Sequence, residues 1–280
     1  MDQSTIVYSH MLQPYPQYCS VSESIAPVGF SLYNAAGVTY NHRFHNGLSV
    51  LVSYTFSKFL DNVEGTNSWA LSGSNSAANS YDLAAEKSVD ASDIPHSLVT
   101  SYIYDLPIGR GTAIGSNFNR KTDAVLGGWE VSGIVTNKSG TPIAVNGNNW
   151  NSYGGNPRPD VIGDPHVSHR GINEWFNTGA FTYASYGHFG TAPRFFSRLR
   201  SQSYNNVDLA IMKNWPLHEA MRVQFRAEMF NAFNHPVFFA PNGSYSGCDP
   251  NASSTCQSGF GTITGTYPQR EIQLSGKFYW

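Results

Sequence analysis

The sequence predicts an all-β protein whose strands run up and down in one antiparallel sheet, as in a segment of a transmembrane β-barrel. Two observations lead to this fold class. Apolar and polar residues alternate in seven segments of the 280-residue chain, and shorter and longer connections alternate between those segments. Successive side chains of a strand point to opposite faces, so the alternation indicates one apolar and one polar face. Outer-membrane barrels combine such strands with tight turns at one rim and long loops at the other.

The first two expected strands, residues 33–44 and 48–57, are separated only by the turn residues "HNG". Both are rich in β-branched and aromatic residues, which favour strands. The first strand places on one face Ala36, Val38, Tyr40 and Phe44. The second strand places Leu48, Val50, Val52, Tyr54 and Phe56 against Ser49, Ser53, Thr55 and Ser57.

Three further strands are expected over residues 96–107, 128–145 and 207–215. The alternation of apolar and polar residues is weak in the first of them and clear in the other two. The apolar positions of the other two are Trp129, Val131, Val135, Val207, Leu209 and Ile211. The opposite face receives Glu130, Ser132, Thr136 and Asp208. These segments therefore continue the division into an apolar and a polar face.

Residues 221–233 alternate most clearly, and the last strand is "REIQLSGKFYW", residues 270–280. In the former, Met221, Val223, Phe225, Ala227 and Met229 oppose Arg222, Gln224, Arg226 and Glu228. These charged side chains would be costly to bury in a soluble core, but facing a hydrated lumen or paired there they are tolerated. In the last strand the apolar face carries Ile272, Leu274, Phe278 and Trp280.

Aromatic residues are expected near both ends of these strands. The rim of the shorter turns would carry Phe44, Trp129, Trp215 and Trp280. The opposite rim would carry Phe56, Phe59, Tyr204, Phe233 and Tyr267. Rings at both ends of an apolar band are typical of the interfacial girdles of membrane barrels. The alternative is that they are ordinary core-edge aromatics of a soluble sheet.

Composition excludes several other classes. Charged residues are 13% of the chain and aromatics 14%, with a net charge of −2, so a general nucleic-acid binder is not expected. No apolar run is long enough for a transmembrane helix, and the first residues show no signal peptide. Cys248 and Cys256 lie in "GCDPNASSTC", where a local disulfide and two free thiols both remain open, and Cys19 has no obvious partner.

The seven expected strands are an odd number, and their sheet has two free edges. Strands in lipid are tolerated only where a closed barrel pairs every backbone group, so we expect this chain to be one segment of a larger barrel. A self-contained small porin fits an odd strand count poorly. The alternative from another class is a soluble, secreted β-sandwich that binds carbohydrate through aromatic loops.

Motifs for catalysis are missing from the sequence. It has neither a G-x-S-x-G elbow nor an H-E-x-x-H zinc motif, and we expect no enzyme activity, no cofactor and no metal. His166 and His169 share a loop but lack further ligands at a suitable spacing. Asp160 and Asp164 lie in a Pro-rich loop and do not by themselves indicate a glycosidase pair.

Two loop segments are candidates for binding. In "NGNNWNSYGGNPRP", Trp150 and Tyr153 stand among several amides, a combination suited to stack on and hydrogen-bond a sugar; the alternative is a Gly/Asn loop whose aromatics cover the rim. The segment "RFFSRLRSQS" contains Arg194, Arg198 and Arg200. On an external loop these would pair with lipopolysaccharide phosphates. A plain solvated loop is the favoured interpretation, and single-stranded nucleic acid is the least favoured.

Eight segments follow one another in the order typical of a known family. They are "LSVLVSYTFSKFLDN", "DIPHSLVTSYIYDLPIGRG", "LGGWEVSGIVTNKSGTPIAV", "RPDVIGDP", "EWFNTGAF", "FGTAPR", "NVDLAIMKNWPL" and "VQFRAEMFNAFNHPVF". From Tyr33 to Trp280 the chain resembles the C-terminal part of TonB-dependent outer-membrane receptors, of the Oar-like branch abundant in acidobacteria. This resemblance implies an outer-membrane location and a barrel of about 22 strands occluded by an N-terminal plug.

The resemblance also implies uptake of a large or scarce ligand, powered by the TonB complex. We expect residues 1–30 to be a lead-in segment and residues 31–280 to be the C-terminal barrel segment of such a receptor, a fragment without the plug. Expected partners are outer-membrane lipid and lipopolysaccharide, the barrel assembly machinery, an unknown ligand for which carbohydrate is one candidate, and the TonB complex through N-terminal parts. Phe278 and Trp280 match the membrane-assembly signal of a last barrel strand.

Overall fold

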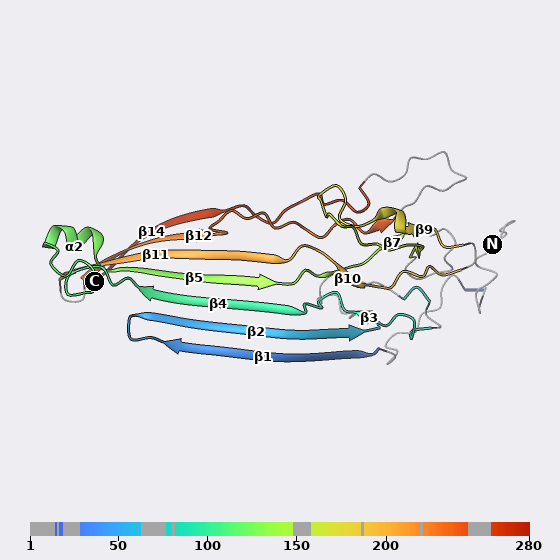
Figure 1. Ribbon diagram of the computed structural model, residues 1–280, viewed down its shortest axis with the longest axis horizontal. Helices are drawn as coiled ribbons and strands as arrows, with labels where there is room; N and C mark the ends of the chain where they lie inside the picture. The colour runs from blue at the N-terminus through green and yellow to red at the C-terminus, as the bar shows by residue number, and fades with distance from the viewer. Residues whose placement is uncertain are drawn as a thin grey trace.

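The computed structural model describes residues 15, 17–18, 29–62, 77–79, 82–147, 158–185, 188–218, 221–245 and 259–280. Its main feature is an antiparallel sheet in which each long strand lies beside the next long strand of the chain (Figure 1). The long strands are β1 (Ser31–Arg43), β2 (Leu48–Asp61), β4 (His96–Asp105), β5 (Trp129–Lys138), β11 (Tyr204–His218), β12 (Met221–Phe230) and β14 (Glu271–Tyr279). All seven predicted strands and their up-and-down order are confirmed.

The strand limits differ from the prediction most in β2 and β5; β11 is also three residues longer at each end than predicted, and β12 ends three residues earlier. β2 continues to Asp61, because its last two residues pair with the short strand β3 (Ser88–Val89). β5 ends at Lys138 and not at Val145, as predicted. Just beyond it the backbone of Gly140 lies so close to Ser201 that a Cβ atom would stand 2.0 Å from the Ser201 carbonyl oxygen. The chain therefore leaves the large sheet here and joins the loops.

The shortest turns fix how neighbouring strands are aligned. Between β1 and β2 the amide of Phe44 donates to the Leu48 carbonyl at 2.7 Å, and Gly47 has a φ of +81°. This left-handed conformation is one that glycine adopts without a steric penalty. From this turn the register runs without a break to the pair Ser31–Asp61. A shift of the register by one residue would exchange the two faces of the strand. The turn therefore also fixes which side chains lie on the apolar face.

The remaining short strands lie beyond one end of the long strands. They form three two-stranded sheets: β6 (Pro142–Ile143) with β10 (Phe196–Arg200), β7 (Asn146–Gly147) with β13 (Ser244–Tyr245), and β8 (Asp160–Val161) with β9 (Phe181–Thr182), which follows the turn η1 (Thr178–Ala180). The described residues of connections 62–95, 139–203 and 231–270 all belong to this end, here called the loop layer (Figure 1). The opposite end, the turn rim, carries α2 (Arg120–Leu126) and the C-terminus.

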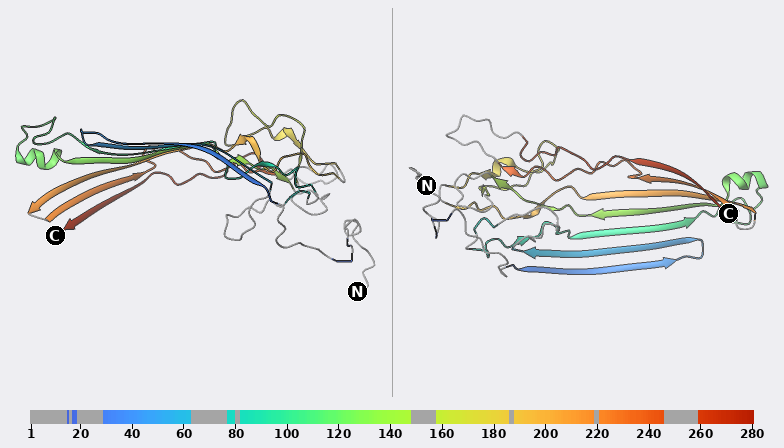
Figure 2. Two further views of the ribbon diagram at one scale, coloured as in Figure 1. Left: turned by 90° about the horizontal axis from the view of Figure 1, so that it is seen from below. Right: turned by 180° about the vertical axis from the view of Figure 1, so that it is seen from behind.

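The large sheet is a single curved layer (Figure 2). No second sheet covers either face of it in the described parts of the chain, so the β-sandwich alternative is wrong. In the described sheet, β1 and β14 are the two edges, each with one neighbour. Among the described helices, none has the length and apolar character needed to cross a membrane.

Candidate functional site

Register divides the side chains of the large sheet between two faces, because directly paired residues point the same way. Tyr54, for example, lies opposite Val38 on one side and Leu98 on the other. Such pairs, followed from β1 to β14, identify the side chains that lie on one face of the sheet, here called the apolar face. Its members include Ala36, Val38, Tyr40, Val50, Val52, Tyr54, Phe56, Leu98, Val131, Val135, Val207, Leu209, Ile211, Val223, Phe225, Ala227, Met229, Ile272, Leu274 and Phe278. The predicted division of these residues is confirmed.

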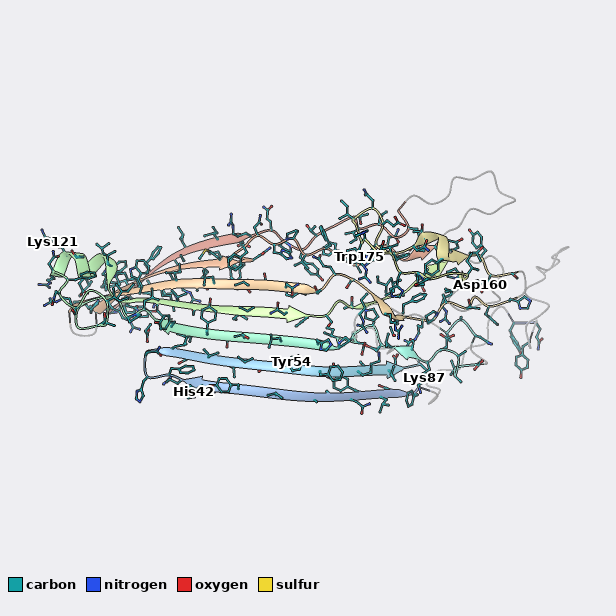
Figure 3. The ribbon with its side chains drawn as sticks, viewed as in Figure 1. His42, Tyr54, Lys87, Lys121, Asp160 and Trp175 are labelled. Carbon is teal, nitrogen blue, oxygen red and sulfur yellow. The ribbon has the colours of Figure 1, made fainter. Side chains whose placement is uncertain are left out.

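Many side chains of the apolar face are exposed. Val38 and Leu274 of the two edge strands are 68% and 69% exposed, and Phe56 of β2, which is paired on both sides, is 51% exposed. A soluble monomer rarely exposes a contiguous apolar surface of this extent. Figure 3 shows how Tyr54 on β2 and His42 on β1 lie along this part of the sheet. The apolar face therefore requires an apolar surrounding.

The opposite, polar face is hollowed. A cavity of about 430 Å³ is lined mainly by residues of this face, among them Ser49, Leu51, Ser101, Ile103, Ser132, Ile134, Asp208, Arg226, Glu228 and Phe230. Arg226 donates to Glu228 at 2.6 Å, which confirms the expected pairing of charges on this face. Asp208 accepts from the amide of Asn231 at 3.0 Å. The lining of the hollow is thus mainly apolar, with Leu51, Ile103 and Ile134 beside a few charged groups.

The aromatic residues at the turn rim agree with the prediction. Trp129 and Trp215 are on the apolar face at this rim, and Phe44 and Trp280, just beyond β1 and β14, contact the rings of His42 and Phe278 on the same face. The opposite rim differs: Phe56 is on the apolar face, but Phe59 and Tyr204 are on the polar face. Phe59 packs edge-on against Tyr33 there. Both residues lie at the rim where they were predicted, but on the polar face, so their assignment to an aromatic girdle was wrong.

The loop layer has a hydrophobic core of its own. Phe176 is fully buried and meets Phe181 and Phe260 edge-on, with ring centroids 5.8 and 5.0 Å apart. The core also contains Ile143, Val145, Trp175, Ala180 and Leu199. Burial among these groups raises the pKa of the Tyr245 hydroxyl, and Tyr183 contributes to the shift. The long connections are thus folded together and do not behave as separate loops.

Three buried arginine–carboxylate pairs join this core to β2 and the connection after it. Arg194 pairs with Asp61, Arg158 with Glu86, and Arg200 with Asp93. Within each pair both side chains are at most 15% exposed. Removing one partner of a buried pair leaves an uncompensated charge, which is strongly destabilising. These pairs consequently fix connection 139–203 against connection 62–95.

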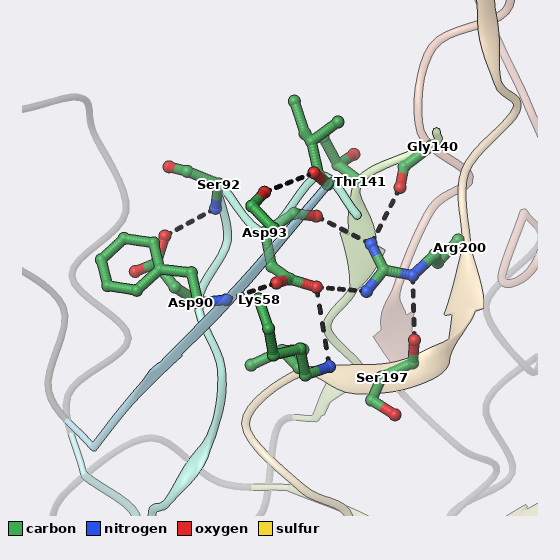
Figure 4. A network of polar contacts seen from close by, with 12 residues as sticks. Lys58, Asp90, Ser92, Asp93, Gly140, Thr141, Ser197 and Arg200 are labelled. Atoms are coloured by element: carbon green, nitrogen blue, oxygen red, sulfur yellow. Dashed lines mark hydrogen bonds and ion pairs between the residues drawn. The ribbon is translucent and has the colours of Figure 1, made fainter. Parts of the chain in front are cut away.

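Arg200 is the centre of the best-connected pair (Figure 4). Its Nη1 donates to the carbonyls of Asp93 at 2.7 Å and Gly140 at 3.0 Å, and its Nε donates to Ser197 at 2.9 Å. Asp93 in turn accepts from the amide of Phe59 at 2.6 Å, and Lys58 is 3.8 Å away. One side chain therefore connects three segments that are distant in sequence.

These contacts change the interpretation of the loop arginines. A freely solvated loop was favoured for Arg194, Arg198 and Arg200, but Arg194 is 2% exposed and Arg200 is engaged inside the protein. Only Arg198 of the three is exposed. The sequence did not reveal the pairs because their acidic partners come from a different connection.

The loop histidines and aspartates predicted to be unremarkable have local partners. Asp164 accepts from the amide of His166 at 3.0 Å, which holds the pKa of the Asp164 carboxyl below its usual value, and the His166 ring lies 2.7 Å from the same oxygen. Asp160 accepts from the amide of Thr191. In the part of the chain that the structure describes, no group of three or more metal-ligating side chains is found. Figure 3 places Asp160 and Trp175 in the loop layer, far from Lys121.

Several predicted site residues lie outside the described residues. These are Trp150 and Tyr153 of the candidate ligand loop, and Cys19, Cys248 and Cys256. Phe278 and Trp280 are described: Phe278 pairs with Val223 on the apolar face, and its ring stacks on that of Trp280 at 6.1 Å. Their role as an assembly signal stays a prediction.

A paired sheet with one exposed apolar face and one hollowed polar face defines the wall of a membrane-spanning β-barrel. The family model for the outer membrane beta barrel domain matches residues 1–273. The chain therefore belongs to this family and is located in the outer membrane. Comparisons with curated proteins and with solved structures gave no match.

Proposed function

We propose that the chain forms part of the wall and the outer loops of a TonB-dependent, Oar-like receptor that takes up a large or scarce solute and has no enzymatic activity. The observation that carries the proposal is the gathering of all three long connections into one folded layer at one end of the wall. Short turns face the periplasm in outer-membrane barrels, and longer loops face outward. Such a layer would meet solutes outside the cell. The order of the eight sequence segments supports the same family.

The polar face supplies a second argument for a transport role. Its hollow contains the pair Arg226–Glu228 and Asp208, together with Leu51 and Ile134. A mainly apolar lining with a few placed polar groups suits a contact surface for a solute that has both apolar and polar parts. In the same role, Trp150 and Tyr153 remain the candidate carbohydrate-binding residues from the sequence.

Lipid and the assembly machinery are the further proposed partners. Arg198 is exposed in the loop layer, where its guanidinium would pair with lipopolysaccharide phosphate. Phe278 lies on the apolar face of β14 and the Trp280 ring stacks on it, an arrangement that supports their role as an assembly signal. Replacing both by serine should strongly lower the amount of protein in the outer-membrane fraction. Tyr279→Ser, on the polar face of the same strand, is the matched control and should leave that amount nearly unchanged.

Uptake itself tests the receptor function. Gram-negative cells that express the receptor containing this chain would be given radiolabelled oligosaccharides, with and without a protonophore. We expect accumulation that stops when the proton gradient is collapsed and falls in the double variant Trp150→Ala, Tyr153→Ala. Accumulation that is indifferent to the protonophore would contradict energised transport. Unchanged uptake by the double variant would contradict the ligand loop alone.

A further inference from the structure

The connection between β4 and β5 contains a short helix that is fixed to the apolar face. Lys213 pairs directly with Trp129 across β11 and β5, and Trp215 follows two residues later, so all three side chains share this face. The Trp129 Nε1 donates to the Val125 carbonyl at 2.9 Å, and the Trp215 Nε1 donates to the Ala124 carbonyl at 2.7 Å. Both carbonyls belong to the last turn of α2.

The Lys213 ammonium completes this attachment. It donates to the Val125 carbonyl at 3.3 Å and to the Gly127 carbonyl, and it lies 5.3 and 5.4 Å from the ring centroids of Trp129 and Trp215. The last carbonyls of a helix lack intrahelical donors and carry partial negative charge, so a cation and two indole N–H groups satisfy them well. Lys213 is only 1% exposed. A buried cation on an apolar face thus has a structural reason, which is to hold α2.

This attachment determines on which side of the wall the helix lies. Because its three anchors point from the apolar face, α2 lies on that side, at the turn rim. The family places the apolar face in lipid, and the turn rim of such barrels borders the periplasm. A helix fastened there meets the phospholipids of the inner leaflet, and it does so whether or not the barrel transports a solute.

The exposed side chains of α2 fit that surrounding. Val125 and Leu126 are 63% and 49% exposed, although both are apolar. Arg120 and Lys121 are exposed as well, and the N-terminus of the helix is occupied by the side chain of Asn119, which accepts from the Thr122 amide. Apolar side chains beside basic ones are typical of helices that lie in a membrane interface.

We propose that α2 is an interfacial anchor, which inserts Val125 and Leu126 into the periplasmic leaflet of the outer membrane while Lys213 holds it against the wall. The occupant of this surface is therefore phospholipid. Arg120 and Lys121 would pair with its phosphates.

The test measures the depth of α2 in vesicles of phosphatidylethanolamine and phosphatidylglycerol. The whole barrel protein that contains this chain, with its cysteines replaced by serine, carries one new cysteine with an environment-sensitive fluorophore at Val125→Cys. Leu274→Cys on the apolar face and Ser275→Cys on the polar face are the deep and aqueous references. Inserted protein is selected by flotation and by quenching of the Leu274 label by lipid with a spin label deep in its acyl chain.

We expect the label at position 125 to be quenched about twofold more by a spin label near the headgroup than by a deep one, as for side chains at the headgroup–acyl boundary. Iodide in the aqueous phase should quench it much less than the label at position 275. A label at position 125 that iodide reaches freely, or that only the deep spin label quenches, would overturn the proposal.

Lys213→Met tests the attachment. In this variant the label at position 125 should become several-fold more accessible to iodide, while the Leu274 label remains quenched by lipid. An unchanged depth at position 125 would show that Lys213 does not hold the helix.

Discussion

Large apolar side chains have opposite surroundings in the wall and in the loop layer. In the wall, Leu274 is 69% exposed and Trp280 is 89% exposed, whereas Phe176, Val145 and Leu199 of the loop layer are fully buried. The loop layer therefore resembles a small soluble domain, which is stabilised by removing its own side chains from water. The wall has paired backbone but no core, and lipid must take the place of that core. Substitutions should consequently act by different rules in the two regions.

The largest expected effect is in the core of the loop layer. Phe176→Ala removes a fully buried ring that contacts Phe181 and Phe260, and it should destabilise the loop layer by about 4 kcal/mol. Hydrogen exchange would measure this at the amide of Trp175, which donates to the Gly261 carbonyl. The strand amides of β12 should keep their protection. Equal loss of protection in both regions would mean that the loop layer and the wall unfold as one unit.

A buried ion pair should come next. Arg194→Met leaves the Asp61 carboxylate buried without its partner, and we expect a loss of about 3 kcal/mol in loop-layer stability. The double variant Arg194→Met, Asp61→Leu removes both charges and should recover most of the loss. Protease cleavage rates in connection 139–203 would report both effects. If the double variant is as unstable as the single one, lost packing and not the unpaired charge is the cause.

Charge placement in the wall tests the role of lipid. Leu274→Arg puts a cation on the apolar face near the middle of β14, and it should cost about 2–4 kcal/mol in a bilayer. The matched variant Ser275→Arg puts the same charge one residue away on the polar face and should cost little. Urea titration of protein in vesicles, followed by heat-modifiable gel mobility, compares the two. Equal costs would contradict the assignment of the faces.

The smallest effect is expected from the ion pair on the polar face. Arg226 and Glu228 are 36% and 29% exposed, so Glu228→Gln should change the stability of the wall by no more than about 1 kcal/mol. The same urea titration measures it. A loss as large as that of Arg194→Met would indicate that this face is dry and not hydrated.

The strands of the wall, apart from the weakly alternating β4, were predictable because each one carries its own signal. In β12, alternate residues such as Val223 and Arg222 differ in polarity, and this pattern depends on no other part of the chain. The wrong assignments of Phe59 and Tyr204 were avoidable by the same rule. Phe59 is an odd number of residues from Phe56, and Tyr204 is an odd number from Val207. Residues at such a spacing point to opposite faces of a regular strand.

The loop layer was not predictable by such local signals. Phe176 and Phe181 stand in a segment without periodicity, and their burial depends on Phe260, which is distant in the sequence. The pairs of Arg194 and Arg158 likewise depend on which connections meet. Helix α2 was missed because the segment "RKTDAVL" is too short for a clear helical period, and only its contacts with Lys213 and the tryptophans reveal its position.

The three buried ion pairs have a consequence for how such barrels diversify. Every arginine of these pairs comes from connection 139–203, and every carboxylate comes from β2 or the connection that follows it. Recombination that exchanged one connection alone would bring mismatched charges into a dry interior. The two connections should therefore be inherited together, and a chimaera intended to acquire a different loop layer must transplant both.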